Sequence, residues 1–268
     1  MVEHGPVRRL LLAAVLVADV GATTYTHSSK LSEAQSSFLN ARYETTAALA
    51  LELRITDPED LAAIELRTTA LLFQLKDLLP ERGDKDKALK ECAPCRELLT
   101  EFLSETTRGQ TVARAKLKTA PADETTLFLL GKIDLNYVWL QLGPLSRKTG
   151  WDEYWEARHS LDAVLAMNPA HVRARVARAW VDYVVDTKMP WGTKWLLGGG
   201  NRKRAVTSMQ AAATAEADDF AHAEARFALW DLYRRERNLP AAVTTAQDLA
   251  RDFPENTELT EFLAKPNK

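Results

Sequence analysis

The sequence predicts an all-α protein built from a series of helix hairpins. Apolar residues recur at spacings of three and four along most of the chain, which is the period of an amphipathic helix, whereas the alternation typical of strands is scarce. Prolines follow several of the helical segments, and a proline ends a helix or begins the next one. These prolines are Pro58, Pro121, Pro169 and Pro254. With 46% apolar and 27% charged residues, the chain has ample material for a folded core.

The clearest hairpin spans residues 221–256. Its two amphipathic segments, 223–236 and 240–252, are separated by "RNLP", and Pro240 suits the first turn of the second helix. Pro254 then ends that helix.

This hairpin resembles one tetratricopeptide repeat (TPR), a 34-residue unit of two helices, A and B. Counted from Ala223, the signature positions of the family fall on Leu229, Trp230, Tyr233, Ala242, Ala246, Leu249 and Pro254. Trp230 stands where the family has a small residue, which predicts looser packing between the two helices. The resemblance implies a right-handed α-solenoid of TPR-like helix hairpins, in which helix A of each repeat lines a concave groove.

Positions equivalent to Pro254 mark the ends of the other repeats. These markers are Pro58, Pro121, Pro169 and Phe220, the last in place of a proline. Three of the separations exceed one repeat, and the signature positions place each excess at a turn between helices A and B. The first insertion is a helix over 85–105, between helix A at 59–79 and helix B at 109–118. The second is the loop around "LGPLSRKTGW", and the third is the loop that includes "MPWGTKWLLGGG". Because equivalent turns share one edge of a solenoid, we expect the insertions to lie side by side.

The repeat domain is expected to cover residues 32–268. A signal peptide at 1–22 and a loose polar segment at 23–31 precede it. The best repeats are 124–169, 172–220 and 223–256, followed by a capping helix at 256–264 that covers the last apolar face.

The signal-peptide prediction rests on basic residues, including Arg8 and Arg9, placed before an apolar run at 10–18, with cleavage after Ala22. Asp19 is atypical of such a segment, and the alternative is an amphipathic N-terminal helix of a cytoplasmic protein. The run is too short to span a bilayer. We therefore expect an exported, periplasmic or secreted chain without a transmembrane helix in its mature form.

Charge and motifs exclude several classes of function. A net charge of -2 gives no overall attraction to nucleic acid. The sequence contains neither G-x-S-x-G nor HExxH, and its five histidines are scattered. We therefore expect no catalytic residues, no metal site, no cofactor and no nucleic-acid partner.

The stretch "MPWGTKWLLGGGNRKRA", residues 189–205, is not a phosphate-binding loop. A P-loop needs a preceding strand and a GK[ST] ending, and here Asn201 and Arg202 follow the last glycine. If Asn201 caps the next helix, then Arg202, Lys203 and Arg204 lie in its first turn, where each cation is disfavoured by about 0.3–1 kcal/mol. Salt bridges to nearby acids or solvation of an exposed face would account for these charges, and the alternative is an anionic ligand or a carboxylate-bearing peptide at this helix start.

Cys92 and Cys95 are the only cysteines, in "KECAPCREL". Arg96 follows in place of the histidine of a c-type haem site, and a second CxxC for zinc is absent. A thioredoxin-like site needs a preceding strand. The pair is therefore expected to form a disulfide across one helical turn or to be two small core residues, and a redox role is the third alternative.

Candidate binding residues fall into two sets. The first lines the groove that the TPR resemblance implies: Arg173, Trp180, Tyr183, Glu224, Phe227, Asp231, Arg234 and Arg235. The Lys and Asn clamp of chaperone-binding TPR domains is not reproduced, since Val176 and Phe227 stand where Asn would be. The second set lies on the insertions: Trp151, Trp191, Trp195, Arg202, Lys203 and Arg204.

We expect a non-enzymatic scaffold that binds a protein or peptide partner through its groove, its insertions or both. The alternative is a protein that binds a small ligand or a cell-envelope polymer with the Trp and basic residues of the insertions. A CxxC thiol oxidoreductase is the third hypothesis. The fold alone does not decide among them.

Overall fold

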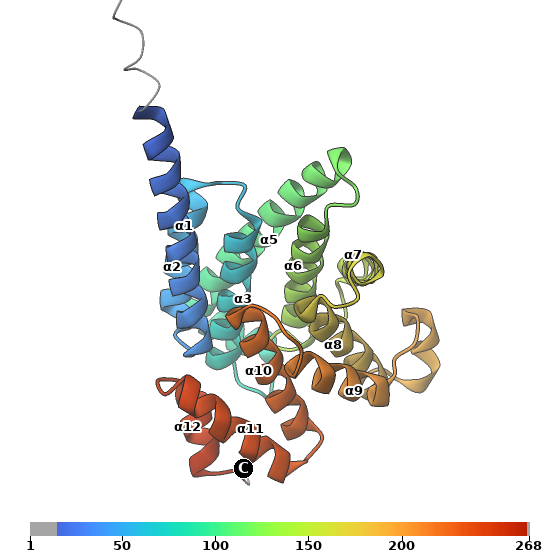
Figure 1. The fold of residues 1–268 in the computed structure, drawn as a ribbon. Helices are drawn as coiled ribbons and strands as arrows, with labels where there is room; N and C mark the ends of the chain where they lie inside the picture. The colour runs from blue at the N-terminus through green and yellow to red at the C-terminus, as the bar shows by residue number, and fades with distance from the viewer. Residues whose placement is uncertain (1–14, 267–268) are drawn as a thin grey trace, which may run out of the picture.

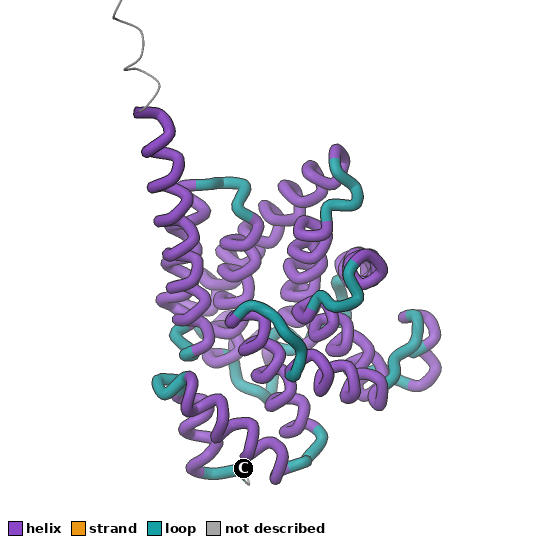
Figure 2. The backbone as a smooth tube through the Cα atoms, viewed as in Figure 1, coloured by secondary structure: helices purple, strands orange, loops and turns teal. Residues whose placement is uncertain are grey.

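The computed structural model describes residues 15–266, with side chains from His27 onward except that of Trp191. Within this range the chain forms twelve α-helices and two short 3-10 helices, without a strand, which confirms the all-α prediction (Figure 2). Consecutive helices pack as antiparallel hairpins that stack along the chain (Figure 1).

Four hairpins make up the repeats, each with a helix A and a helix B. They are α3 (Leu61–Leu78) with α5 (Ala93–Thr119), α6 (Glu124–Leu142) with α7 (Trp151–Met167), α8 (Val172–Lys188) with α9 (Arg202–Ala213), and α10 (Asp219–Arg235) with α11 (Leu239–Asp252). A hairpin of α1 (Val15–Leu39) and α2 (Tyr43–Thr56) precedes them, and α12 (Thr257–Ala264) covers the end of the array. The short helix α4 (Lys85–Glu91) and the 3-10 helices η1 (Trp191–Thr193) and η2 (Trp195–Leu197) belong to the insertions.

The repeat-ending prolines occupy one recurring turn. The residue before each proline accepts a hydrogen bond from the N–H three positions later, at 3.1 Å in all four cases: Asp60 to Asp57, Asp123 to Ala120, His171 to Asn168, and Asn256 to Phe253. Proline suits the second position of such a turn because its φ is already fixed. The donor residue is also the N-cap of the next helix, and its side chain accepts a first-turn N–H. This turn therefore ends one helix and starts the next.

Two sequence predictions need correction. The helix expected over 85–105 is interrupted at Cys92, because Cys92 both ends α4 and caps α5. The expected helix B at 109–118 is not separate from it, since the 27-residue helix α5 covers both. Residues 23–31 are helical within α1 instead of loose. Residues 1–14 of the expected signal peptide lie outside the described range, so that prediction stays a prediction.

Trp230 fills the position where the family has a small residue. It is buried, and the side chains packed with it include Ala242 and Ala246 of α11. Its ring also contacts Phe262 of α12, with centroids 5.5 Å apart. Small residues on helix B thus compensate for the large one on helix A.

The first and last helices of the array contact each other. The Asn256 side chain donates a buried hydrogen bond of 2.8 Å to the Leu39 carbonyl, and the Tyr43 hydroxyl donates one of 2.5 Å to Glu258. An ion pair between Arg42 and Glu255 joins the same corners. The array is therefore closed by its own ends, in contrast to the open groove that the resemblance implies.

Candidate functional site

The interior of the array holds a charge network to which each helix A contributes one residue. Glu65 of α3, Lys132 of α6, Arg173 of α8 and Glu224 of α10 are its members. Lys132 lies 2.6 Å from Glu224 and 3.6 Å from Glu65, and Arg173 lies 3.1 Å from Glu65 and also pairs with Glu224. The two positive and two negative charges balance one another.

The side chains of this network are mostly buried, and aromatic rings flank it. The Arg173 guanidinium lies 4.8 Å from the Phe128 ring centroid and 4.9 Å from that of Phe220. Burial alone would raise the pKa of Glu224, but attraction by Arg173 and Lys132 outweighs burial and lowers this pKa to about 2. The acids opposite it likewise raise the pKa of Arg173 despite its burial. Arg173 and Glu224, two of the predicted groove residues, are thus paired inside the protein.

The chain's own helix α1 covers the part of the expected groove around Phe227. Leu31, Ala34 and Phe38 of α1 share one apolar cluster with Leu66 of α3 and with α10. The α10 residues in that cluster are Phe220, Ala223 and the predicted groove residue Phe227. Sequence periodicity identified the correct face of α10, but this face packs against α1 and leaves no open groove there.

The other predicted groove residues lie between the middle and the C-terminal end of α8 and α10. They are Trp180, Tyr183, Asp231, Arg234 and Arg235. The guanidinium of Arg235 pairs with Asp231 at 2.9 Å and lies 5.3 Å from the Trp180 ring centroid. Arg234 lies 4.8 Å from the Trp230 ring centroid. The Tyr183 hydroxyl donates to Glu236 at 2.8 Å, and burial together with this contact raises the pKa of Tyr183 to about 12.

A wide surface pocket of about 590 Å³ lies beside these residues. It is lined by Tyr183, Asp186, Thr187, Lys188, Arg202, Arg235 and Glu236. Three basic and two acidic side chains belong to this lining, so it carries a small excess of positive charge.

The three insertions lie next to one another, in chain order. Arg147 of the α6–α7 loop pairs with Asp86 of α4 at 2.7 Å, which joins the first insertion to the second. Trp151 at the end of the second insertion and Leu197 of the third line one small cavity of about 20 Å³. We call the surface formed by residues 84–96, 143–151 and 189–204 the insertion edge; in Figure 1 its α8–α9 segment projects from the body of the molecule.

Arg158 of α7 holds the third insertion in place. Its guanidinium donates to the carbonyls of Leu197 (2.9 Å), Gly198 (2.9 Å) and Gly199 (3.3 Å). It also donates to the Tyr154 hydroxyl, which in turn donates to Leu197. Sequence reasoning missed Arg158, because one buried arginine in a helix leaves no periodic signal.

The three glycines of this loop have separate structural reasons. Gly198 and Gly199 have φ values of +73° and +71°, a region that favours glycine. A Cβ on Gly200 would lie 2.6 Å from the Asp182 carbonyl oxygen and from the Asp186 nitrogen, so only glycine permits this close approach to α8.

Acidic side chains of the protein offset the cations at the start of α9. Asp186 accepts the backbone N–H of Arg202 at 2.9 Å and pairs with Lys194 at 2.8 Å; these hydrogen bonds lower the pKa of Asp186. Arg204 pairs with Asp182 at 2.7 Å, and Arg202 pairs with Glu236. Lys203 is exposed. Internal acids thus supply the negative charge, and an anionic ligand is not needed to explain this helix start.

Apolar side chains stand exposed on the insertion edge. Trp195 is 73% exposed, Leu196 is 55% exposed and Trp151 is 44% exposed. The side chain of Trp191 lies outside the described residues. Exposed large apolar groups that adjoin one another are typical of interaction surfaces.

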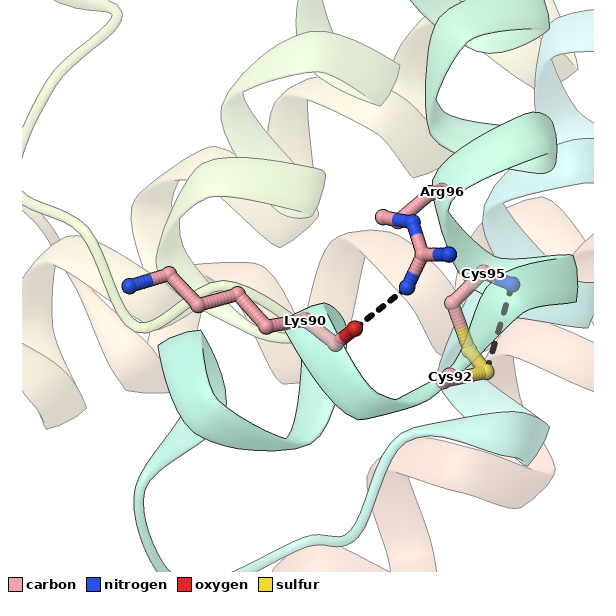
Figure 3. The surroundings of a disulfide bond; sticks show 4 residues. All are labelled: Lys90, Cys92, Cys95 and Arg96. Carbon is pink, nitrogen blue, oxygen red and sulfur yellow. Dashed lines mark hydrogen bonds between the residues drawn. A yellow bond between two sulfur atoms is a disulfide. The ribbon is translucent and has the colours of Figure 1, made fainter.

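Cys92 and Cys95 are joined by a disulfide in the first insertion (Figure 3). Cys95 is fully buried, whereas Cys92 is half-buried. In the described part of the chain, no cluster of three or more His, Cys, Asp or Glu side chains is arranged to hold a metal. None of the helices formed by residues 15–266 has the length and apolar character to cross a membrane.

Similarity of this chain to known proteins is found in structure and not in sequence. No protein-family model matches the sequence, and no curated protein matches it. Among solved structures, a thermophilic TPR protein from Thermus thermophilus is similar, with a TM-score of 0.49 and 15% identity over 89% of this chain and 97% of that chain. Successive helix hairpins, separated by the recurring proline turn and closed by a capping helix, give this chain a TPR-like helical-repeat fold.

Proposed function

We propose that this protein is a non-enzymatic helical-repeat scaffold that binds a protein or peptide partner through the insertion edge. The observation that carries the proposal is the pair Trp195 and Leu196, exposed side by side on a loop that Arg158 and Asp186 hold in place. Aromatic anchors of this kind dominate the binding energy of many interfaces.

The fixed backbone of the third insertion supports binding. A loop that must become ordered on binding loses affinity, whereas a loop already fixed by internal contacts does not. Hydrogen bonds from Arg158 hold the carbonyls of Leu197 and Gly198, and Lys194 is bound to Asp186. The edge therefore presents apolar anchors without a large ordering cost.

The groove is less available to a partner than the sequence predicts. Its central charges, including Arg173 and Glu224, pair with each other, and α1 packs over Phe227. A partner would have to displace α1 and break buried ion pairs to bind there, which costs several kcal/mol. The insertion edge requires no such displacement.

The test compares two double variants in extracts of the source organism, by crosslinking and mass spectrometry of captured proteins. Trp195→Ser with Leu196→Ser removes the anchors of the edge. Ile55→Ser with Leu78→Ser is the matched control, because these side chains are 65% and 51% exposed and lie outside the insertion edge. We expect a specific partner to be lost from the first variant and kept by the second. Equal capture by both variants would contradict the proposal.

The second candidate function is binding of a small anionic ligand or a cell-envelope polymer. The 590 Å³ pocket favours it, since Lys188, Arg202 and Arg235 lie along this pocket. Trp180, in contact with Arg235, would report such binding as a change in fluorescence. Our proposal predicts no change on addition of cell-wall fragments or anionic small molecules, and a saturable change would favour the second candidate.

We also propose that the protein is exported. The basic residues and apolar run at the start of the sequence support this. The disulfide supports it as well, because disulfides form and persist in oxidising compartments. N-terminal sequencing of the protein from its native host tests export. We expect the mature chain to start after Ala22, and a chain that keeps its initiator methionine would contradict export by this route.

A further inference from the structure

The disulfide lies where two helices of the insertion edge meet. Cys92 ends α4 and is the N-cap of α5, and Cys95 lies on the first turn of α5 (Figure 3). The backbone N–H of Cys95 donates to the Cys92 sulfur at 3.2 Å. The two sulfurs therefore sit at the start of a 27-residue helix.

This bond contributes little to holding the fold together. It joins residues separated by only three positions, which the first turn of α5 already holds close. A disulfide stabilises chiefly by closing a long loop in the unfolded chain, so this one constrains the unfolded state weakly. Cys95 is fully buried in a core cluster that includes Leu89 and Phe102, and this packing holds it in place independently of the bond.

The charges around Cys92 favour its thiolate form. At the N-terminus of α5 the backbone N–H of Cys95 donates to the Cys92 sulfur, and a helix N-terminus stabilises a thiolate. The opposing carbonyl at the end of α4, that of Lys90, accepts a hydrogen bond from the Arg96 guanidinium, which adds a positive charge at the same junction (Figure 3). The neighbouring acid Glu91 lies 3.8 Å from Lys87, which offsets its charge.

From these contacts we propose that Cys92–Cys95 is a reactive disulfide that exchanges with accessible thiols, with Cys92 as the sulfur that the thiol attacks. Unequal burial sets the direction, because Cys92 is half-buried and Cys95 is fully buried. The site is independent of partner binding at Trp195, although both belong to the insertion edge.

The exchange proceeds in two balanced steps. An incoming thiolate forms a bond to the Cys92 sulfur, the Cys92–Cys95 bond breaks, and Cys95 leaves with the electron pair as a thiolate that takes a proton from water. A second thiolate then attacks the incoming sulfur of this mixed disulfide, and Cys92 leaves as the thiolate that the α5 N-terminus stabilises. Two thiols are oxidised to one disulfide, and a low-molecular-weight disulfide reverses the sequence to restore the Cys92–Cys95 bond.

The experiment uses the full-length protein with glutathione as the probe. Oxidised protein is equilibrated in buffers of graded reduced-to-oxidised glutathione ratio, quenched with acid, alkylated and analysed by mass spectrometry. We expect the bond to become half reduced within the range of these buffers. Full retention of the disulfide in a large excess of reduced glutathione would overturn the proposal. A parallel series with a short cysteine-containing peptide distinguishes a small-molecule thiol from a protein thiol as the preferred reactant.

Single-cysteine variants test the roles of the two sulfurs. Cys95→Ser leaves Cys92, and we expect its alkylation by iodoacetamide at pH 7 to be about tenfold faster than that of cysteine in an unfolded peptide. Adding Arg96→Gln to this variant should slow the reaction about threefold. Cys92→Ser leaves the buried Cys95, which should react slowly. Circular dichroism checks that each variant is folded. If Cys92 reacts no faster than the peptide, or more slowly than Cys95, the proposal is wrong.

Discussion

The three consecutive glycines of the third insertion allow its clamped conformation to be tested by matched alanine substitutions. Gly198 and Gly199 have nearly the same positive φ, but their surroundings differ. A Cβ at Gly199 meets no atom of the described chain within 4 Å, whereas a Cβ at Gly198 would lie 2.9 Å from Arg158 Cζ. A Cβ at Gly200 would lie 2.6 Å from two backbone atoms of α8.

The expected costs follow from these contacts. Gly199→Ala carries only the cost of a left-handed conformation, about 1–2 kcal/mol. Gly198→Ala carries the same cost and also displaces the Arg158 guanidinium. A hydrogen bond from a charged donor is worth about 1.5–3 kcal/mol, so the total is about 2.5–5 kcal/mol. Gly200→Ala pushes against backbone that cannot rotate away, which costs about 3 kcal/mol or more and separates the loop from α8.

Hydrogen exchange followed by mass spectrometry is the suitable assay, because the loop is able to open without global unfolding. Amides of residues 189–201 should exchange faster in Gly198→Ala and Gly200→Ala than in Gly199→Ala. Urea denaturation measures the effect on the whole domain. If Gly199→Ala loosens the loop as much as Gly198→Ala does, the Arg158 contacts do not hold the loop and the reasoning is refuted.

Three further predictions concern buried polar groups. Burial, with the nearby Glu156 adding to it, raises the pKa of Asp134 to about 8, so the folded state keeps a proton that the unfolded chain releases, and stability falls between about pH 4 and 8. Asp134→Asn should remove this fall and raise the melting temperature at pH 8 but not at pH 4; an unchanged pH profile would contradict it. Glu224, with its pKa lowered to about 2, contributes stability above about pH 4.5 that is lost toward pH 2, so Glu224→Gln should be destabilised at pH 7 and flatten that acid limb in urea titrations. Asn256→Asp keeps an N-cap acceptor but loses the donor to the Leu39 carbonyl, which should cost about 1–3 kcal/mol in urea denaturation; no loss would show that the closure does not contribute to stability.

The repeat boundaries were predictable from sequence because their cause is local. Pro121 fixes a turn, Asp123 caps the next helix, and both lie within the same four residues of the chain. The placement of the insertions at A-to-B turns follows from the same markers. The proximity of Arg147 to Asp86 agrees with the expectation that equivalent turns share an edge.

The filled groove was not predictable because it depends on contacts between distant segments. Periodicity shows that Phe227 lies on an apolar face, but not that α1 covers this face. Likewise, Glu65 and Glu224 are ordinary acids on two helices until the fold brings both to Arg173. The sequence predicts that acidic side chains pair with Arg202 and Arg204, but it does not predict which ones. The structure identifies them as Glu236 and Asp182.

Site-specific photocrosslinking tests the central claim most directly, namely that the insertion edge and not the groove meets the partner. A benzophenone amino acid is placed at position 195 or at position 227, and the products are identified by mass spectrometry in extracts of the source organism. Position 195 is exposed, and position 227 packs with the α1 cluster. We expect crosslinks from 195 to a second protein and crosslinks from 227 to the chain's own residues 27–39. A second protein captured from 227 but not from 195 would contradict the account.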